Sequence, residues 1–412
     1  MNSMKPLFET YGKYAVQKAI DALRENGGGQ VCIPAGVHET VGLELYSNIE
    51  LHLEAGAVLS FSDDPGDYPV IRTRWEGYEQ DSYRPLLYAF GQQNLFVTGP
   101  GTLEGNGRRW WELFHKGEMT TARPCFICFE RCENIQLRDF RVQNSPAWTL
   151  HPLCSSNILI SGVSVVNPYD SPNTDGIDPE SCRNVRIIGC YIDVGDDCIA
   201  IKAGTEDADE QIPCENIVIM GCNMNHGHGG VVLGSEMSGS IRRVSVTGCI
   251  FNGTDRGIRI KTRRHRGGSL DGMSVSDVMM HDVVCPFVVN MMYYCGKDGH
   301  EPYVADPNPQ PVDERTPAVR HIQLSNIHVS GCRSAAVCLY GIPESPIEDF
   351  RMNNVSIEMV DGEPETPVMC ASSFPMNRAG VYAEHCRGLD LSGLNMTGVR
   401  GPEKQFVNVD LA

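Results

Sequence analysis

A short repeated phrase constrains the fold of this 412-residue chain more than any other feature. Each copy places an Asn or Arg near the start of alternating apolar residues, which lead into a small residue or a Gly-Cys pair. The copies are SNIELHLEAG (47–56), QNLFVTGPG (93–101), ENIQLRDFRV (133–142), SNILISGVSV (156–165), RNVRIIGCYI (183–192), ENIVIMGCNM (215–224), RRVSVTGCIF (242–251), RHIQLSNIHV (320–329) and RGLDLSGLNM (387–396). Alternation with period two in segments rich in Val and Ile predicts β-strands.

The spacing of the copies predicts a solenoid. From Asn134 the marker residue recurs at Asn157, Asn184, Asn216 and Arg243, at intervals of 23, 27, 32 and 27 residues. Amphipathic helical windows are not apparent between the strands, which argues against βαβ units. Strands that recur at this period predict turns that stack on one another and share a core. Asn and Cys at equivalent turns are expected to form internal ladders.

The N-terminal region departs from the repeat. Val16, Ala19, Ile20 and Leu23 follow the spacing of one face of a helix, which the glycines at 27–29 would end. A short helix of this kind would cover the open end of a solenoid core. We therefore expect an N-terminal cap and entry strand over residues 1–40.

The length suggests two or three domains, but the sequence contains no evident linker. Residues 62–86 and 296–317 interrupt the repeat, and both read as long excursions on a rigid scaffold. We therefore predict a single domain over residues 1–412, with stacked coils from about 41 to 400.

The composition limits which binding partners and which cellular compartment are expected for this protein. The chain has 34 Lys and Arg and 52 Asp and Glu, so its net charge is −18. This acidic balance argues against nucleic acid or an anionic membrane as a partner. The sequence has neither an apolar run long enough to span a membrane nor a visible signal peptide, so a cytoplasmic protein is expected, with a trimmed secreted chain as the alternative. The 17 cysteines are scattered, and Cys125, Cys128 and Cys132 are interpreted as small buried residues rather than a zinc site. We expect no metal and no cofactor, and the oligomeric state is open.

Four short polar motifs carry the candidate chemistry. They are Asn173-Thr174-Asp175-Gly176, Gly195-Asp196-Asp197, Gly227-His228-Gly229 and Arg259-Ile260-Lys261. Asp175, Asp196, His228 and Arg259 follow one another at 21, 32 and 31 residues, about one turn of the repeat. Residues one turn apart in stacked parallel strands lie about 4.8 Å from each other. Three carboxylates, an imidazole and two cations should therefore meet on one face.

Nearby polar residues receive a plainer interpretation. Asp178 and Glu180 are interpreted as turn groups, and His226 and His265 as surface histidines.

These motifs, in this order and spacing, resemble family 28 of the glycoside hydrolases, the polygalacturonases, and most closely its bacterial exo-acting members. The segments AVQKAIDAL and GGGQVCIPAG are also similar to the N-terminal cap and first coil of that fold. The resemblance implies an all-β, single-stranded right-handed parallel β-helix of the pectin-lyase-like type with a short N-terminal capping helix. It also implies hydrolysis of α-1,4-galacturonosyl linkages with inversion.

The resemblance assigns a catalytic role to each motif. Asp196 would be the general acid, Asp175 and Asp197 would position and deprotonate water, and His228 would tune the protonation of the acid. Crowded carboxylates suit such work, because mutual repulsion raises the pKa of at least one of them. Carboxylates on adjacent rungs would lie about 5 Å apart, nearer the retaining separation, so inversion is taken from the family.

The resemblance also assigns the substrate contacts. Arg259 and Lys261 would hold the carboxylate of a galacturonate, Lys202 would add a third cation, and Asn173 would contact sugar hydroxyls. Tyr293 would stack on a sugar face, or it and Tyr294 would pack within the strands. The basic run at 256–266 is expected to make the groove positive although the whole chain is acidic.

Alternatives stay open at this point. A rhamnogalacturonan hydrolase could use the same scaffold, a pectate lyase could bind Ca²⁺ through the three aspartates, and a carbohydrate-binding solenoid would have no catalysis. Exo action is expected because the two excursions would wall off one end of the groove, and because a cytoplasmic enzyme would meet imported oligomers rather than polymer.

Overall fold

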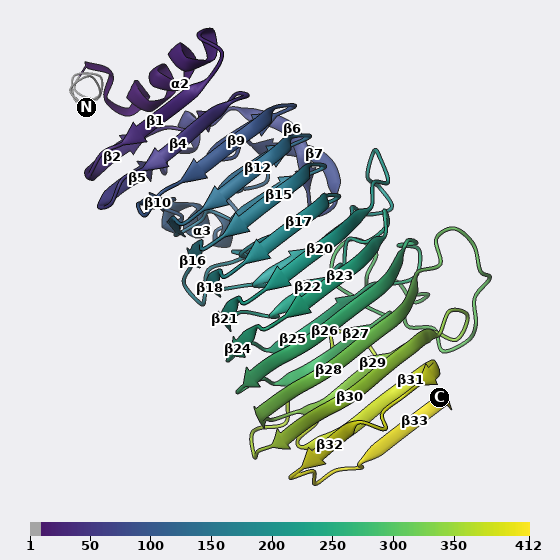
Figure 1. Ribbon diagram of the computed structural model, residues 1–412. Helices are drawn as coiled ribbons and strands as arrows, with labels where there is room; N and C mark the ends of the chain where they lie inside the picture. The colour runs from purple at the N-terminus through teal and green to yellow at the C-terminus, as the bar shows by residue number, and fades with distance from the viewer. Residues whose placement is uncertain (1–9) are drawn as a thin grey trace. The chain divides into compact units, whose positions relative to one another are not determined.

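The computed structural model describes residues 10–412, which form two compact units of parallel strands (Figure 1). Unit 1 runs through Trp75 and then from Glu79 to Asp196, and unit 2 comprises Glu76–Tyr78 and Asp197–Ala412. Within residues 10–412, none of the helices has the length and apolar character to span a membrane. The single domain over 1–412 stays a prediction, and residues 1–9 of the predicted cap lie outside the described part.

Unit 1 contains most of the helical residues. Its helices are η1 (Gly12–Tyr14), α2 (Ala15–Glu25), η2 (Pro65–Asp67) and α3 (Arg108–His115). Its strands are β1 (Gly29–Ile33), β2 (Gly36–Thr40), β3 (Leu43–Glu44), β4 (Ile49–Leu53), β5 (Ala57–Phe61), β6 (Val70–Trp75), β7 (Tyr78–Tyr83), β8 (Leu87–Phe90), β9 (Gln93–Thr98), β10 (Thr102–Glu104), β11 (Ile127–Glu130), β12 (Glu133–Arg138), β13 (Arg141–Gln143), β14 (Leu150–Leu153), β15 (Ser156–Ser161), β16 (Ser164–Val166), β17 (Arg183–Ile188) and β18 (Tyr191–Val194).

Successive coils of unit 1 place their strands in three parallel ladders. The ladders are β1–β4–β9–β12–β15–β17, β2–β5–β10–β13–β16–β18 and β3–β8–β11–β14. The pairing is in register, with Leu95, Ile135, Ile158 and Val185 stacked as Cα partners in the first ladder. This coil-by-coil order of parallel strands confirms the predicted parallel β-helix.

Unit 2 continues the same pattern of strands. They are β19 (Ile199–Ile201), β20 (Cys214–Met220), β21 (Asn223–His226), β22 (Val231–Leu233), β23 (Ile241–Thr247), β24 (Ile250–Asn252), β25 (Arg256–Lys261), β26 (Ser269–His281), β27 (Cys285–Asn290), β28 (Ala318–Cys332), β29 (Ala335–Tyr340), β30 (Ile347–Met359), β31 (Ala379–Leu389), β32 (Leu394–Thr397) and β33 (Lys404–Leu411). The candidate site residues of this unit lie on the ladder β19–β22–β25–β27–β29–β31–β33 or next to the ends of its strands.

Asparagine ladders join successive coils, as the repeat predicts. Asn94 Nδ2 donates to Asn48 Oδ1 at 2.7 Å, and Asn184 Nδ2 donates to Asn157 Oδ1 at 3.1 Å. These four residues have φ between 57° and 64°. Asn tolerates this left-handed conformation better than most residues, because its short side chain hydrogen-bonds locally. The marker residue of the repeat is therefore the point near the start of these strands at which the backbone is left-handed.

The N-terminal helix covers the first coil as expected. Helix α2 buries Ala15, Val16 and Ile20. After it, a Cβ atom at Gly28 would lie 2.4 Å from the carbonyl oxygen of Asn48, and the φ of Gly28 is +127°. Glycine is therefore required where the helix turns into the first strand.

Three features of the fold differ from expectation. Helix α3 lies between β10 and β11 and buries Trp110, although no helical window was predicted there. Strands β26 and β30 are further rungs that the repeat search missed, since Gly272 and Asp349 replace the marker Asn there. The excursion at 62–86 forms a two-stranded sheet of β6 and β7, whereas 296–317 contains no strand.

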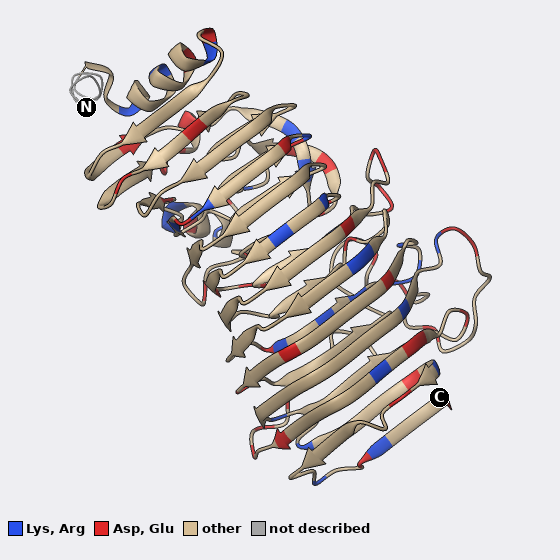
Figure 2. Cartoon of the chain, viewed as in Figure 1, with Lys and Arg blue, Asp and Glu red and all other residues tan. Residues whose placement is uncertain are grey.

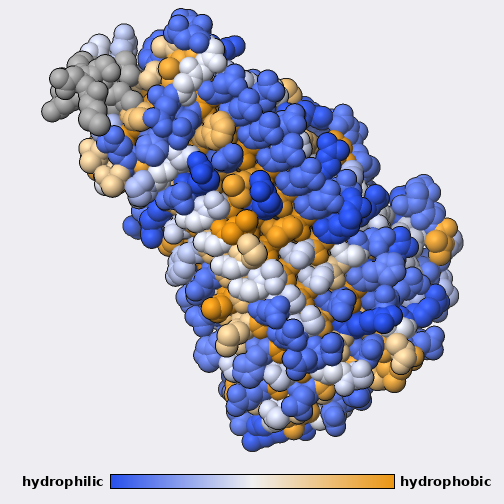
Figure 3. Space-filling view, in the orientation of Figure 1, coloured by the Kyte–Doolittle hydropathy of each residue, from blue (hydrophilic) through white to orange (hydrophobic). Residues whose placement is uncertain are grey.

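Outward positions of the coils are mostly polar. On the visible face acidic and basic residues are interspersed along the strands (Figure 2), and hydrophilic residues cover most of the surface (Figure 3). Inward positions are apolar, and the cysteines 125, 128 and 132 are at most 5% exposed, which confirms their interpretation as buried residues.

Candidate active site

The Asn-Thr-Asp-Gly motif forms a tight turn in unit 1. The N–H of Thr149 donates to the carbonyl oxygen of Asp175 at 2.9 Å, and the N–H of Leu150 donates to that of Gly176 at 3.0 Å. The side chain of Thr174 is buried and shares a hydrogen bond of 2.5 Å with Ser171. The backbone of the preceding coil thus fixes Asp175, which is 3% exposed.

Asn173 is held by an arginine that sequence reasoning did not select. Arg123 Nη2 donates to Asn173 Oδ1 at 2.6 Å, while Arg123 Nη1 donates to the carbonyl oxygens of Pro146 and Pro172. The amide oxygen of Asn173 therefore has a partner, and its predicted contact with sugar hydroxyls would fall to the amide nitrogen.

The Gly-Asp-Asp motif carries the chain from one unit to the other. A Cβ atom at Gly195 would lie 2.5 Å from the carbonyl oxygen of Ser171, so only glycine fits this turn. Asp196 is half-buried at the end of unit 1, whereas Asp197 begins the long segment of unit 2 and is 1% exposed.

Asp197 is a buried carboxylate of unit 2 that binds two cations. Lys261 Nζ lies 2.8 Å from Asp197 Oδ2, and Arg259 Nη1 lies 3.4 Å from Asp197 Oδ1. Burial disfavours the charged form, but the positive charges of Lys261, Arg259 and then Lys202 outweigh it and hold the pKa of Asp197 well below its usual range. Asp197 is therefore ionised at neutral pH, which suits a base or a water-positioning group and not an acid.

The Arg-Ile-Lys motif lies on β25 as the alternation predicts. Arg259 and Lys261 both reach Asp197, so their side chains share a face, while Ile258 and Ile260 are buried. Both cations are at most 7% exposed. Their pairing with Asp197 was not foreseen, because an alternating strand does not show which acid its cations will meet.

The Gly-His-Gly motif also approaches Asp197. A Cβ atom at Gly229 would lie 3.2 Å from Asp197 Oδ1 and 2.4 Å from Cγ2 of Val232, so glycine leaves room for the carboxylate. His228 itself is exposed. Exposure leaves its imidazole accessible from solvent, and its role beside the acid stays a prediction.

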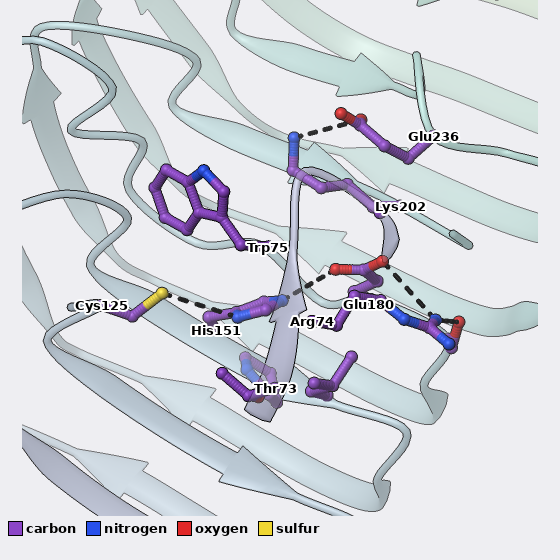
Figure 4. Close-up of polar contacts among 12 residues, drawn as sticks. Thr73, Arg74, Trp75, Cys125, His151, Glu180, Lys202 and Glu236 are labelled. Carbon is purple, nitrogen blue, oxygen red and sulfur yellow. Dashed lines mark hydrogen bonds and ion pairs between the residues drawn. The ribbon is translucent and has the colours of Figure 1, made fainter. Parts of the chain in front are cut away.

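Lys202 and Tyr293 complete the cationic cluster of unit 2. Lys202 Nζ lies 3.5 Å from Glu236 Oε2, an acid that sequence reasoning missed (Figure 4). Burial opposes ionisation of Glu236, yet the charge of Lys202 lowers its pKa. The ring centroid of Tyr293 lies 5.8 Å from Arg259 Cζ and 5.4 Å from Lys261 Nζ. Tyr293 is 9% exposed, so it packs beside the cations, whereas Tyr294 stacks on His300.

Only part of the basic run at 256–266 lies beside Asp197: Arg259 and Lys261 bind it, whereas the later arginines of the run bind other acids. Arg263 and Arg266 both bind Glu206, and Arg264 binds Glu344 and the carbonyl oxygens of residues 303, 304 and 306. These arginines are at most 5% exposed. They hold loops against the strand ends, so the positive charge beside Asp197 comes from a few lysine and arginine side chains.

Glu180 is not the simple turn group that its motif suggested. Its side chain is fully buried, accepts a hydrogen bond of 2.9 Å from His151 Nε2, and lies 3.6 Å from Arg74 Nη1 (Figure 4). No local signal could have found this cluster, because Arg74 and Glu180 are more than a hundred residues apart. His226 and His265 are exposed, as expected.

Comparison with known proteins decides the family. The model of "Glycosyl hydrolases family 28" matches residues 32–373. The chain belongs to this family. It is therefore a glycoside hydrolase, which favours hydrolysis over the lyase and binding-module alternatives.

Individual relatives agree with the family match. A "Probable polygalacturonase" of Vitis vinifera is 32% identical over 95% of this chain and 80% of that protein. An exopolygalacturonase structure from Thermotoga maritima is 28% identical, covers 89% of each chain and superposes with a TM-score of 0.68. The structure of a Yersinia enterocolitica family 28 exopolygalacturonase covers 97% of this chain and 74% of its own, with a TM-score of 0.80 at 21% identity, and shows the shared fold.

Proposed function

We propose that this enzyme hydrolyses α-1,4-galacturonosyl linkages of pectic polygalacturonate and its oligomers, with inversion, and releases single sugars from a chain end. The observation that carries the proposal is Asp197, buried between Lys261 and Arg259 and directly preceded by the half-buried Asp196. The names of the relatives, polygalacturonase and exopolygalacturonase, support the same substrate class.

Each aspartate has a distinct task in the proposed mechanism. Asp196 protonates the glycosidic oxygen of the leaving sugar; it is half-buried and so the most accessible to substrate of the three carboxyls. Asp197, kept ionised by its cations, positions the attacking water together with Asp175 and accepts its proton. His228 exchanges protons with Asp196 between turnovers.

The cations select an acidic sugar. Lys261 has three N–H donors and Arg259 five, so each retains donors beyond those that bind Asp197. A galacturonate carboxylate can use these donors, which gives the site a preference for uronates over neutral sugars. Lys202 strengthens the local positive potential, and Asn173 donates to a hydroxyl group of the substrate.

A reducing compartment fits the cysteines. All 17 are free thiols in the described residues, and most are buried. A cytoplasmic enzyme that trims imported oligomers is therefore our proposal for its setting.

Incubation with polygalacturonate and a panel of defined oligosaccharides tests the proposal. A hydrolase forms reducing ends without ultraviolet-absorbing unsaturated ends, and it retains activity in a chelator. Release of unsaturated products by an activity that a chelator abolishes would instead establish a lyase. Preferential cleavage of rhamnogalacturonan oligomers would move the substrate to that polymer, and inverted anomers in the first product, observed by NMR, test the stereochemistry.

A further inference from the structure

The side-chain amide of Asn173 has a defined orientation. Its Oδ1 accepts a hydrogen bond of 2.6 Å from Arg123 Nη2. Arginine carries hydrogen-bond donors only, so the amide atom that faces Arg123 has to be the oxygen. Asn173 is half-buried, and the part of the chain that the structure describes supplies no acceptor for its Nδ2. Two N–H donors are therefore held two residues before Asp175, where a ligand can use them.

Arg123 is itself fixed by two neighbouring segments. Its side chain is buried, since the residue is 3% exposed. Its Nη1 donates to the carbonyl oxygen of Pro146 at 2.8 Å and to that of Pro172 at 2.7 Å. A planar guanidinium that binds acceptors through two of its nitrogens cannot rotate without losing one of these hydrogen bonds. Arg123 thus ties the turn that contains Asn173 to the preceding coil.

Helix α3 supports Arg123 in two ways. The Cζ atom of Arg123 lies 4.1 Å from the centroid of the Phe114 ring, so the cation stacks on an aromatic side chain. Trp111 Nε1 donates to the carbonyl oxygen of Ser145 at 3.0 Å, and Ser145 immediately precedes Pro146, an acceptor of Arg123. The helix therefore contacts the guanidinium directly and also holds the segment that this guanidinium binds.

We propose that Arg123 is a positioning residue for the hydrolase reaction and that Phe114 holds it in place. Arg123 directs the amide nitrogen of Asn173 toward the sugar bound at Asp175, where this nitrogen donates to a hydroxyl oxygen. A cation at the amide oxygen also polarises the amide group, which makes its N–H groups stronger donors. This inference rests on the proposed function and gives helix α3, which occurs in a single coil, a role in substrate binding.

A double-mutant cycle with an oligogalacturonate substrate tests the role of Arg123. Asn173→Ala removes the donor and should lower kcat/KM about tenfold, and Arg123→Met should lower it by a similar factor. Because Arg123 acts through Asn173, the double variant should also lose about tenfold, whereas independent effects would multiply to about 100-fold. Thermal melts of all variants accompany the kinetics, since a merely structural Arg123 would lower the thermal midpoint and leave kcat/KM of the folded enzyme unchanged.

Phe114→Ala tests the same link from the surface of helix α3 and keeps the proposal testable if Arg123→Met does not fold. Phe114 is 43% exposed, so its replacement should leave the fold intact and lower kcat/KM about threefold. In the Asn173→Ala background the same substitution should change nothing. Arg108→Met is the matched control, because the Arg108 side chain lies on the same helix and is 88% exposed, and kcat/KM should stay unchanged in both backgrounds.

The outcomes separate this inference from the proposed function. If wild type hydrolyses no galacturonan, the proposed function is overturned and this inference with it. If wild type is active but folded Arg123→Met or Phe114→Ala keeps the wild-type kcat/KM, this inference is overturned and the hydrolase assignment stands. Losses that multiply with that of Asn173→Ala would also overturn it, since Arg123 would then act by another route.

Discussion

Removing the charge of Lys261 is the most direct test of how the site is held together. Lys261→Met keeps the length of the side chain but removes the ion pair of 2.8 Å with Asp197 Oδ2. At an effective dielectric constant of about 20, charges at this distance attract by about 6 kcal/mol, before the cost of removing both ions from water. Arg259 remains at 3.4 Å from the other oxygen. We therefore expect a loss of about 3 kcal/mol in the free energy of unfolding at pH 7, at the low end for a broken buried pair.

The loss should depend on pH in a defined direction. The folded pKa of Asp197 lies well below its unfolded value, so its ion pairs stabilise the protein fully above an unfolded pKa of about 3.9. This stability is lost as the pH falls toward the folded pKa. The difference between Lys261→Met and wild type should therefore be constant from pH 7 to pH 5 and shrink below about pH 4.

Urea unfolding followed by circular dichroism at several pH values measures this difference. Lys297→Met is the matched control, since Lys297 forms an exposed pair with Asp207 in the same unit and its loss should change stability little. The reasoning is refuted if Lys261→Met is as stable as the control at pH 7, or if its deficit grows as the pH falls. Lys261→Met should also raise the KM for oligogalacturonates more than it lowers kcat.

Three further substitutions test separate parts of the structure. Asp196→Asn should lower kcat by at least about 10²-fold with an unchanged unfolding transition, and near-wild-type turnover would disprove its role as the acid. Gly229→Ala should destabilise the protein by about 1–3 kcal/mol in a thermal melt and reduce turnover, because a Cβ atom there would lie 2.4 Å from Val232 and 3.2 Å from Asp197; an unchanged melt would show that the backbone yields easily. Trp110→Ala should cost about 3–5 kcal/mol, since this residue is the buried anchor of helix α3, and a smaller loss in urea unfolding would mean that the cavity collapses.

The repeat made the fold predictable from the sequence. Asn94, Asn134 and Asn157 lie near the starts of β9, β12 and β15 with φ values near +57°, and the alternating residues after them pair from coil to coil. The repeat pattern is local in the sequence. Each coil contains its own marker residue and inward-facing side chains, and these stack on the equivalent residues of the next coil. Helix α3 was missed for the same reason: it belongs to a single coil and repeats nowhere.

The motifs named the candidate catalytic residues but not their partners. Asp197 binds both Lys261 and Arg259 across two coils, although the strand register aligns Arg259 with Ala200 and not with Asp197. A run of basic residues in the sequence does not show where each charge lies in the fold. In the run at 256–266, Arg263 and Arg264 bind acidic side chains of other segments and do not line a groove.

The sequence by itself therefore determined the coil, its turns and the order in which the polar motifs arrive along the solenoid. Only the tertiary structure decided which charges meet, which are buried and where the β6–β7 hairpin, which carries Arg74 and Trp75, is attached. The physical reason is the range of the interactions. The stacking of coils recurs at short intervals along the chain, so a local pattern in the sequence reveals it. The pairing of Arg74 with Glu180 and the stacking of Trp75 on Trp148 join segments that are far apart in the sequence, and no local pattern predicts such contacts.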